Sequence, residues 1–263
     1  RRTGMATAGC LSLPGLLSAP LREEIEPNWI TKPEWLNLTK EPAIEPELPI
    51  IDPHHHLWDR NQLRDRYMLE ELLEDTKDHN VRQTVFVECS AMYRADGPEE
   101  FKVVGETEFV QGVAAKSASG DYGETRVATG IVGSVDLRAG ERVAAVLESQ
   151  MAASPQRFRG IRHRAAWGDS AYLRSLGGWP SKPAKAPQRI LLDPDFRKGY
   201  AHLRTYGLSF EGWVFHTHID DLTDLAKAFP DTTIIFNHLG GPIGVESYAG
   251  RRDDVFAAWK LSV

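Results

Sequence analysis

The residues best suited to chemistry in this chain are three consecutive histidines, His54, His55 and His56. They follow an apolar run at 48–51, which predicts a buried strand that delivers the histidines at its C-terminal end. Successive side chains of a strand point to opposite faces, so His54 and His56 share a face and His55 points away. Two imidazoles on one face suit a divalent metal ion or a substrate carboxylate. The alternative is a surface histidine run or the remnant of a tag.

Two further segments place histidines after predicted strands. His216 and His218 follow an apolar pair, and His216 is the next candidate for a metal ligand. A core histidine and a helix-capping neighbour are the alternative for these two residues. His238 lies in the segment NHLGGP at 237–242, where its ring could orient or polarise a substrate carbonyl. A supporting role behind another side chain remains open for His238.

Charged residues also follow predicted strands. Arg162, in the segment GIRH at 160–163, is a candidate clamp for a substrate carboxylate because its planar fork suits bidentate binding. The alternative for Arg162 is a surface ion pair, and His163 beside it is a second candidate for substrate binding. Glu88 could supply a carboxylate, whereas Cys89 on a buried strand is interpreted as a packing residue. Glu106, on a predicted helix, is expected to be solvated or salt-bridged.

The elements that position these residues alternate between strand and helix. Apolar runs predict strands at 49–52, 83–88, 127–135, 158–162, 208–215 and 232–237. Helical spacing predicts helices at 66–80, 98–116, 141–149, 194–206, 220–228 and from 252 to the C-terminus, and Asp193 is expected to cap the fourth. Residues 167–190 are expected to form a long loop. This alternation predicts parallel βαβ units of the α/β class.

Reactive residues after successive strands favour a (β/α)8 TIM barrel, whose active site is built at the C-terminal ends of its strands. A doubly wound sheet would concentrate its ligands at one switch point, usually with a glycine-rich phosphate loop, and no such motif is present. Six units fill residues 49–263, and a complete barrel would need about 70 residues more. The expected fold is therefore a TIM-barrel type truncated after about six β/α units.

Composition narrows the partners and the compartment. The net charge is −6, and no basic stripe carries interleaved aromatic residues, so neither nucleic acid nor a membrane is expected as a partner. Two cysteines give no disulfide framework and suit a reducing compartment, which favours the cytoplasm. A small-molecule substrate is the expected partner, and a homo-oligomer is compatible with the sequence.

Residues 1–48 differ from the rest of the chain and are interpreted as an N-terminal extension before a domain at 49–263. A pair of arginines followed by a small apolar segment leaves organellar targeting open. The proline-rich part that follows predicts an extended arm lying over the domain.

The segments at 48–59, 158–163 and 237–242, together with His216, resemble the amidohydrolase superfamily. The resemblance is to its amidohydrolase-related (amidohydrolase 2) branch of metal-dependent TIM-barrel hydrolases, which includes 2-pyrone-4,6-dicarboxylate lactonase-like and sugar-lactonase-like enzymes. It covers about residues 45–260 and implies that His54, His56 and His216 hold a divalent metal, with zinc expected and a metal-free mechanism known in the branch. It further implies catalytic roles for His216 and His238 and substrate binding by Arg162 or His163.

The resemblance implies hydrolysis of a lactone of a small carboxylic acid by metal-activated water. A non-oxidative decarboxylase of the same superfamily is the first alternative, and an inactive truncated form is the second. The strand-eight aspartate that activates water in the family has no counterpart in residues 49–263, because Asp253 and Asp254 fall on the last predicted helix.

Overall fold

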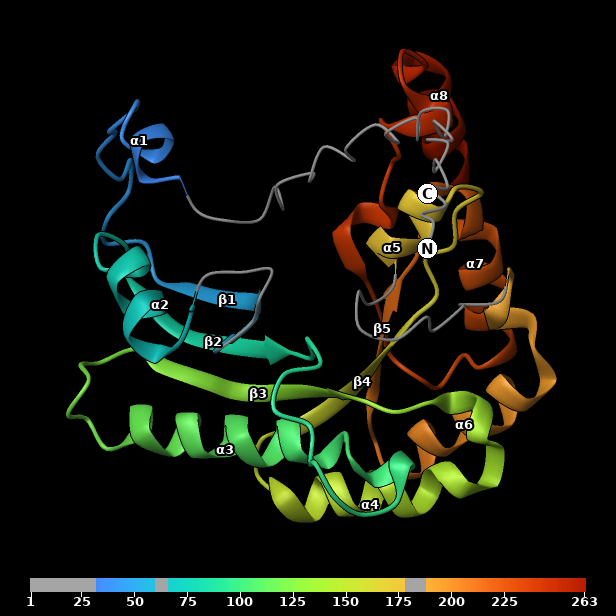
Figure 1. Ribbon diagram of the computed structural model, residues 1–263, viewed down its shortest axis with the longest axis horizontal. Coiled ribbons are helices and arrows are strands. Elements are labelled where there is room, and N and C mark those ends of the chain that lie inside the picture. The colour runs from blue at the N-terminus through green and yellow to red at the C-terminus, as the bar shows by residue number, and fades with distance from the viewer. Residues whose placement is uncertain (1–31, 60–65, 178–187) are drawn as a thin grey trace, which may run out of the picture.

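A computed structural model describes residues 32–59, 66–177 and 188–263, and its centre is one parallel sheet (Figure 1). Its six strands run in sequence order across the sheet, and every neighbouring pair is parallel. They are β1 (Ile50–His55), β2 (Val81–Val87), β3 (Arg126–Ser134), β4 (Phe158–Arg164), β5 (Ser209–Trp213) and β6 (Ile234–Phe236). The sheet curls into a half-barrel, which confirms the predicted TIM-barrel type with about six units.

Helices connect the strands. The α-helices are α1 (Pro33–Leu36), α2 (Leu69–Thr76), α3 (Val104–Ala118), α4 (Val143–Ala153), α5 (Ala171–Gly177), α6 (Pro194–Thr205), α7 (Ile219–Ala228) and α8 (Arg252–Ser262). Short 3-10 turns include η2 (Leu137–Arg142), η4 (His216–His218) and η5 (Asn237–Gly240). In Figure 1, α3 and α4 lie below β3, and α6 and α7 lie to the right of β5.

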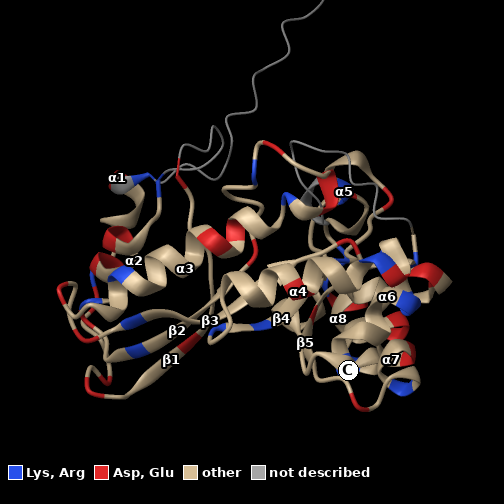
Figure 2. Ribbon diagram, turned by 90° about the horizontal axis from the view of Figure 1, so that it is seen from below, with Lys and Arg blue, Asp and Glu red and all other residues tan. Residues whose placement is uncertain are grey.

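The hydrophobic core lies between the sheet and these outer helices. Phe196, Tyr200 and Phe210 are fully buried, and their rings contact one another where α6 packs on β5. Asp193 caps α6 by accepting hydrogen bonds from the next turn, with Pro194 at the first position, as the sequence predicts. Figure 2 shows that α6 and α7 carry charged residues of both signs.

The two outermost strands leave backbone edges without a neighbouring strand among the described residues. On these edges Ile51 of β1 is 62% exposed and Ile235 of β6 is 43% exposed. A closed barrel would cover both edges, so their exposure follows directly from the six-stranded arrangement.

Several predicted boundaries differ from the observed ones. β1 continues through His55, because this residue pairs with Phe86 of β2. β5 ends at Trp213 instead of residue 215, since the chain turns into η4 there. The predicted loop at 167–190 contains α5 at its start and leads into a 3-10 turn at Ile190–Leu192, and its residues 178–187 lie outside the described part.

Only residues 32–48 of the predicted N-terminal arm are described, and residues 1–31, with the targeting segment, lie outside that part. Trp35, Leu38 and Ile44 are 67%, 76% and 96% exposed, so these side chains are not packed on the domain. Among the described helices, none combines the length and the apolar character needed to cross a membrane.

Candidate active site

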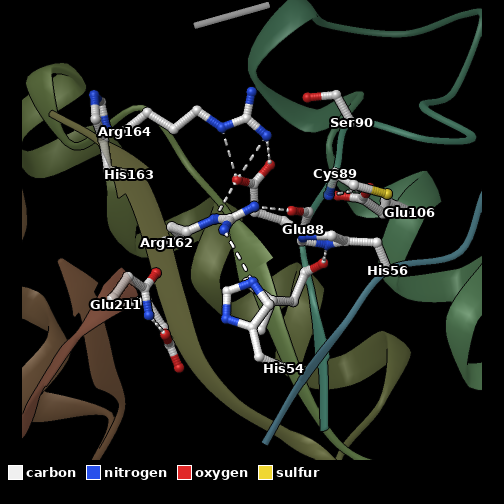
Figure 3. Close-up of polar contacts among 12 residues, drawn as sticks. His54, His56, Glu88, Cys89, Ser90, Glu106, Arg162, His163, Arg164 and Glu211 are labelled. Atoms are coloured by element: carbon white, nitrogen blue, oxygen red, sulfur yellow. Dashed lines mark hydrogen bonds and ion pairs between the residues drawn. The ribbon is translucent and has the colours of Figure 1, made fainter. Parts of the chain in front are cut away.

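The candidate site lies on the inner face of the half-barrel, at the C-terminal ends of the strands (Figure 3). β1 contributes His54, and His56 follows directly after this strand, while Glu88 follows β2 and Arg162 lies near the end of β4. Parallel strands bring their C-terminal ends to one edge of the sheet, which explains why residues more than 70 positions apart meet here.

His54 and His56 lie together, with ring centroids 5.0 Å apart and the rings edge to face. His56 Nδ1 donates a hydrogen bond to the backbone oxygen of Val87 at 2.7 Å, which leaves Nε2 with the lone pair. Burial, with the charge of Arg162 next, lowers the pKa of His54 to about 4 and that of His56 to about 2. Both rings are therefore neutral near pH 7.

His55 points to the other face, as the strand periodicity predicts. Its Nε2 lies 2.8 Å from the hydroxyl of Thr84, and its ring packs against Phe86. Asp52 accepts a hydrogen bond from the backbone nitrogen of His54 at 3.0 Å, which gives its carboxylate a structural role in the first strand.

Arg162 is 5% exposed, so the alternative of a surface ion pair is wrong. Its Nε donates to Glu88 Oε1 at 2.7 Å, and its Nη2 donates to the backbone oxygen of the same residue. Its Nη1 lies 3.4 Å from His54 Nε2, which accepts because a guanidinium only donates. Two of the three guanidinium nitrogens are thus engaged by Glu88, and only Nη1 turns toward the histidines.

Glu88 is 1% exposed and also binds Arg164, whose Nε and Nη2 lie 3.1 Å from its two carboxylate oxygens. Burial alone would raise the pKa of Glu88, but the charges of Arg164 and Arg162 hold it below its ordinary value. Glu88 is therefore an ionised carboxylate at the centre of a buried ion-pair network.

Glu106 is buried at 1% exposure, so the expectation of a solvated or salt-bridged helix residue is wrong. Its Oε1 accepts hydrogen bonds from the backbone nitrogens of Cys89 at 2.9 Å and Ala91 at 2.7 Å. Burial and the nearby charge of Glu88 raise the pKa of Glu106 to about 8. Cys89 is buried, and burial raises the pKa of its thiol, in line with a packing role.

His238 lies beside the β1 histidines. Its ring centroid is 4.8 Å from that of His54 and 4.7 Å from that of Trp213. The neighbouring residue Asn237 is buried and donates a hydrogen bond to Glu211 of β5. Partial burial of the ring, followed by the charge of Arg162, lowers the pKa of His238.

The other predicted site residues have different neighbours. The ring of His216 packs on Tyr248, and its Nδ1 lies 3.4 Å from the backbone nitrogen of Ile243. The ring centroids of His218 and Trp167 are 6.2 Å apart. The ring of His163 meets Phe196 of α6, so its position does not support a role in substrate binding.

The donor chemistry of His54 and His56 fits a divalent metal ion. A histidine binds a metal only as the neutral imidazole, which both rings are, and the hydrogen bond from His56 to Val87 orients its ring as in ligating histidines. The single lone pair of His54 Nε2 accepts from Arg162 Nη1 in this structure, so a metal at this nitrogen would replace that contact. No group of three or more His, Cys, Asp or Glu suited to a metal is gathered within residues 32–59, 66–177 and 188–263, so His216 does not join the pair in this conformation.

A family model described as amidohydrolase matches residues 51–261, a range that includes every residue described above for the candidate site. The chain belongs to the amidohydrolase family. This membership confirms the resemblance carried by the histidine, GIRH and NHLGGP segments.

Relatives of this amidohydrolase show how far the likeness extends. An uncharacterized protein of Sinorhizobium fredii, y4mH, is 27% identical over 240 residues, which are 82% of this chain and 68% of that protein. An amidohydrolase from Burkholderia multivorans, solved once with bound HEPES and once with bound zinc, superposes with a TM-score of 0.54 at 21% identity over 81% of this chain.

A third relative is a probable 2-pyrone-4,6-dicarboxylic acid hydrolase from Acinetobacter baumannii, solved with citric acid bound. Its TM-score is 0.50 at 13% identity, over 81% of this chain. The chain spans 64% and 63% of the two Burkholderia structures and 66% of the Acinetobacter structure. At these identities the solved structures show the shared fold.

Glu211 and Arg164 of this amidohydrolase were not identified from the sequence as residues near the site. The burial of Glu106 was not predicted from the sequence either. Glu211 lies inside β5, where a buried charge requires a partner, and Arg164 lies two residues after Arg162 in β4, so strand alternation places both arginines on one face. Glu106 lies four residues before Val110 and seven before Val113, both buried, so helical spacing places it on the buried face of α3.

Proposed function

We propose that this amidohydrolase opens the ring of a lactone of a small carboxylic acid. The observation that supports the proposal best is the neutral pair His54 and His56 beside the guanidinium of Arg162. The pair suits an electrophilic metal, and the guanidinium suits the negative charge of a carboxylate or of the oxygen that develops charge.

A zinc ion is the expected cofactor, because a relative of the same fold was solved with zinc. Bound at this site, the ion would lower the pKa of a water molecule and polarise the ester carbonyl. We assign its binding to His54 and His56. His216 receives no part in holding it in this conformation, since its ring contacts Tyr248 instead.

The remaining residues bind and orient the substrate. Arg162 Nη1 is the guanidinium nitrogen directed toward His54, so it is assigned to an anionic oxygen of the substrate. Glu88 fixes the orientation of that guanidinium through its carboxylate and its backbone oxygen. His238, whose imidazole lies next to His54, is assigned to the lactone carbonyl, to which its ring N–H can donate.

The test is a hydrolysis screen with the 263-residue chain, with and without added zinc. Carboxylated five- and six-membered lactones, including 2-pyrone-4,6-dicarboxylate, are followed by the acid released on ring opening. We expect turnover that a chelator abolishes, zinc restores and the Arg162→Gln variant lowers. The matched control is Arg82→Gln, which removes an exposed arginine of β2. Absence of turnover with every lactone would reject the proposal.

The same screen distinguishes lactone hydrolysis from the alternative function, non-oxidative decarboxylation. That reaction releases carbon dioxide while the lactone ring remains, so carbon dioxide without ring opening would assign the chain to it.

A further inference from the structure

We propose that Glu211 is a positioning residue that places the imidazole of His238 in the site by holding the side chain of Asn237. The inference rests on the proposed function for the role of His238. It assigns a role to Glu211 of β5, whose carboxyl group acts on the site through the side chain of Asn237.

The first observation is the burial of the two side chains. Glu211 is 3% exposed and Asn237 is 4% exposed. Asn237 Nδ2 donates a hydrogen bond to Glu211 Oε2, and Oδ1 of the same amide is buried without a hydrogen-bond partner among the described residues. The bond to Glu211 is therefore the interaction that fixes the orientation of this amide.

The second observation is the strained turn that follows Asn237. His238 and Leu239 have φ angles of 49° and 52°, in the left-handed region that side chains with a Cβ rarely adopt. Two such residues in succession persist only where the surroundings determine the backbone, and they concentrate at functional positions. Glu211 supplies one such determinant at the start of the turn.

The packing at the end of the turn supplies another. A Cβ on Gly240 would collide with the ring of Phe236 and come within 2.8 Å of Ile219, so the backbone packs too closely here for any side chain. The indole of Trp259 on α8 donates a hydrogen bond to the backbone oxygen of Leu239 at 2.5 Å. The turn is thus fixed on both sides of His238, by the Glu211 hydrogen bond before it and by packing after it.

This turn determines where the imidazole of His238 lies. His238 is exposed on its turn, yet its ring meets both His54 of β1 and Trp213 of β5. Glu211 lies two residues before Trp213, and it is the register partner of Arg162. The same two strands thus supply the anchor of the turn and the arginine of the site.

A carboxyl group at this buried position of a strand is unfavourable unless it has a specific partner. Burial raises the pKa of Glu211, which means that the enclosed position disfavours its charge. An apolar residue would fill a strand interior at lower cost. The bond to Asn237 and the turn that it anchors explain why an acid is placed there.

The test compares Glu211→Gln with Glu211→Leu in the full chain. Glutamine retains an oxygen that accepts from Asn237, whereas leucine fills similar space without an acceptor. The first readout is the nuclear Overhauser effect between the rings of His238 and Trp213, which requires no substrate. We expect the leucine variant to lose it and the glutamine variant to retain it.

The second readout is turnover in a double-mutant cycle with His238→Ala. We expect Glu211→Leu to lower kcat at least about tenfold with little change in KM, and to have no further effect when His238 is alanine. The matched control is Thr107→Val, which removes the buried hydrogen bond to Gln150 away from the site. It should lower stability while leaving both readouts unchanged.

Three outcomes would overturn the inference: an intact ring contact in Glu211→Leu, its loss in Glu211→Gln, or additive effects in the cycle. If the chain hydrolyses no lactone, the proposed function fails, and the ring contact still decides whether Glu211 positions His238.

Discussion

Arg162 on β4 and Glu88 after β2 contact each other twice, side chain to carboxylate at 2.7 Å and side chain to backbone oxygen. Both side chains are buried, and Arg164 reaches the same carboxylate. The contact joins two strands at the C-terminal edge of the sheet, beside His54. It therefore ties the stability of the half-barrel to the geometry of the site.

The Glu88→Gln variant should be strongly destabilised, because it removes the carboxylate charge that the buried guanidinium of Arg162 contacts. We expect the free energy of unfolding to fall by about 3–5 kcal/mol. Urea denaturation followed by circular dichroism measures the change. The matched control is Glu108→Gln, which removes an exposed partner of Arg94 and should cost no more than about 1 kcal/mol. Equal losses in both variants would contradict the buried-pair interpretation.

Glu106 should make stability depend on pH. Its folded-state pKa is raised to about 8, mainly by burial, from an ordinary value of 4.5. Between these values the folded chain keeps a proton that the unfolded chain has released. The contribution of this group to stability is therefore complete below pH 4.5 and is lost as the pH rises toward 8. The slope from this group is at most about 1.4 kcal/mol per pH unit.

The Glu106→Gln variant isolates this contribution, since other titrating groups are shared with the wild type. Unfolding free energies from about pH 5 to about pH 8 should decline less steeply in the variant than in the wild type. Glu108→Gln, on the same helix but exposed, should keep the wild-type slope. An unchanged slope in Glu106→Gln would show that the carboxyl group is not held protonated.

Two helix glycines should respond in opposite directions to alanine. A Cβ on Gly199 of α6 would collide with the backbone oxygen of Leu137, so Gly199→Ala must push α6 away from η2. We expect a loss of about 1–3 kcal/mol. A Cβ on Gly112 of α3 would meet no neighbouring atom within 4 Å, and Gly112→Ala should stabilise by about 0.5–1 kcal/mol. Thermal denaturation of the pair measures both, and an undiminished stability of Gly199→Ala would contradict the close approach.

Local patterns predicted the sheet because each strand contains or follows apolar residues and because the strands alternate with helices along the chain. The pairing of His54 with His56 also followed from strand periodicity, and their ring contact agrees with it. The ends of the elements were less predictable. β5 ends two residues early because the chain turns into η4, which depends on packing between distant segments.

The partners of the charged residues could not be read from the sequence. Arg162 and Glu88 are 74 positions apart, and no local pattern indicates which carboxylate an arginine meets. The burial of Glu106 was within reach of helical periodicity, but the usual preference of a carboxylate for solvent suggested the opposite. The strained turn at His238 depends on tertiary contacts of its neighbours with Glu211 and Trp259.

The His54–His56 pair should bind zinc in the absence of substrate. Calorimetric titration of the metal-free chain should show binding that His54→Ala and His56→Ala each weaken by more than about 100-fold, because losing a ligand costs more than losing the group that orients it. His79→Ala removes an exposed histidine after α2 and serves as the control. The backbone oxygen of Val87 orients the imidazole of His56, so this ring is held for a ligand even before the metal binds. Equal affinity in His56→Ala and His79→Ala would exclude the pair as the metal site.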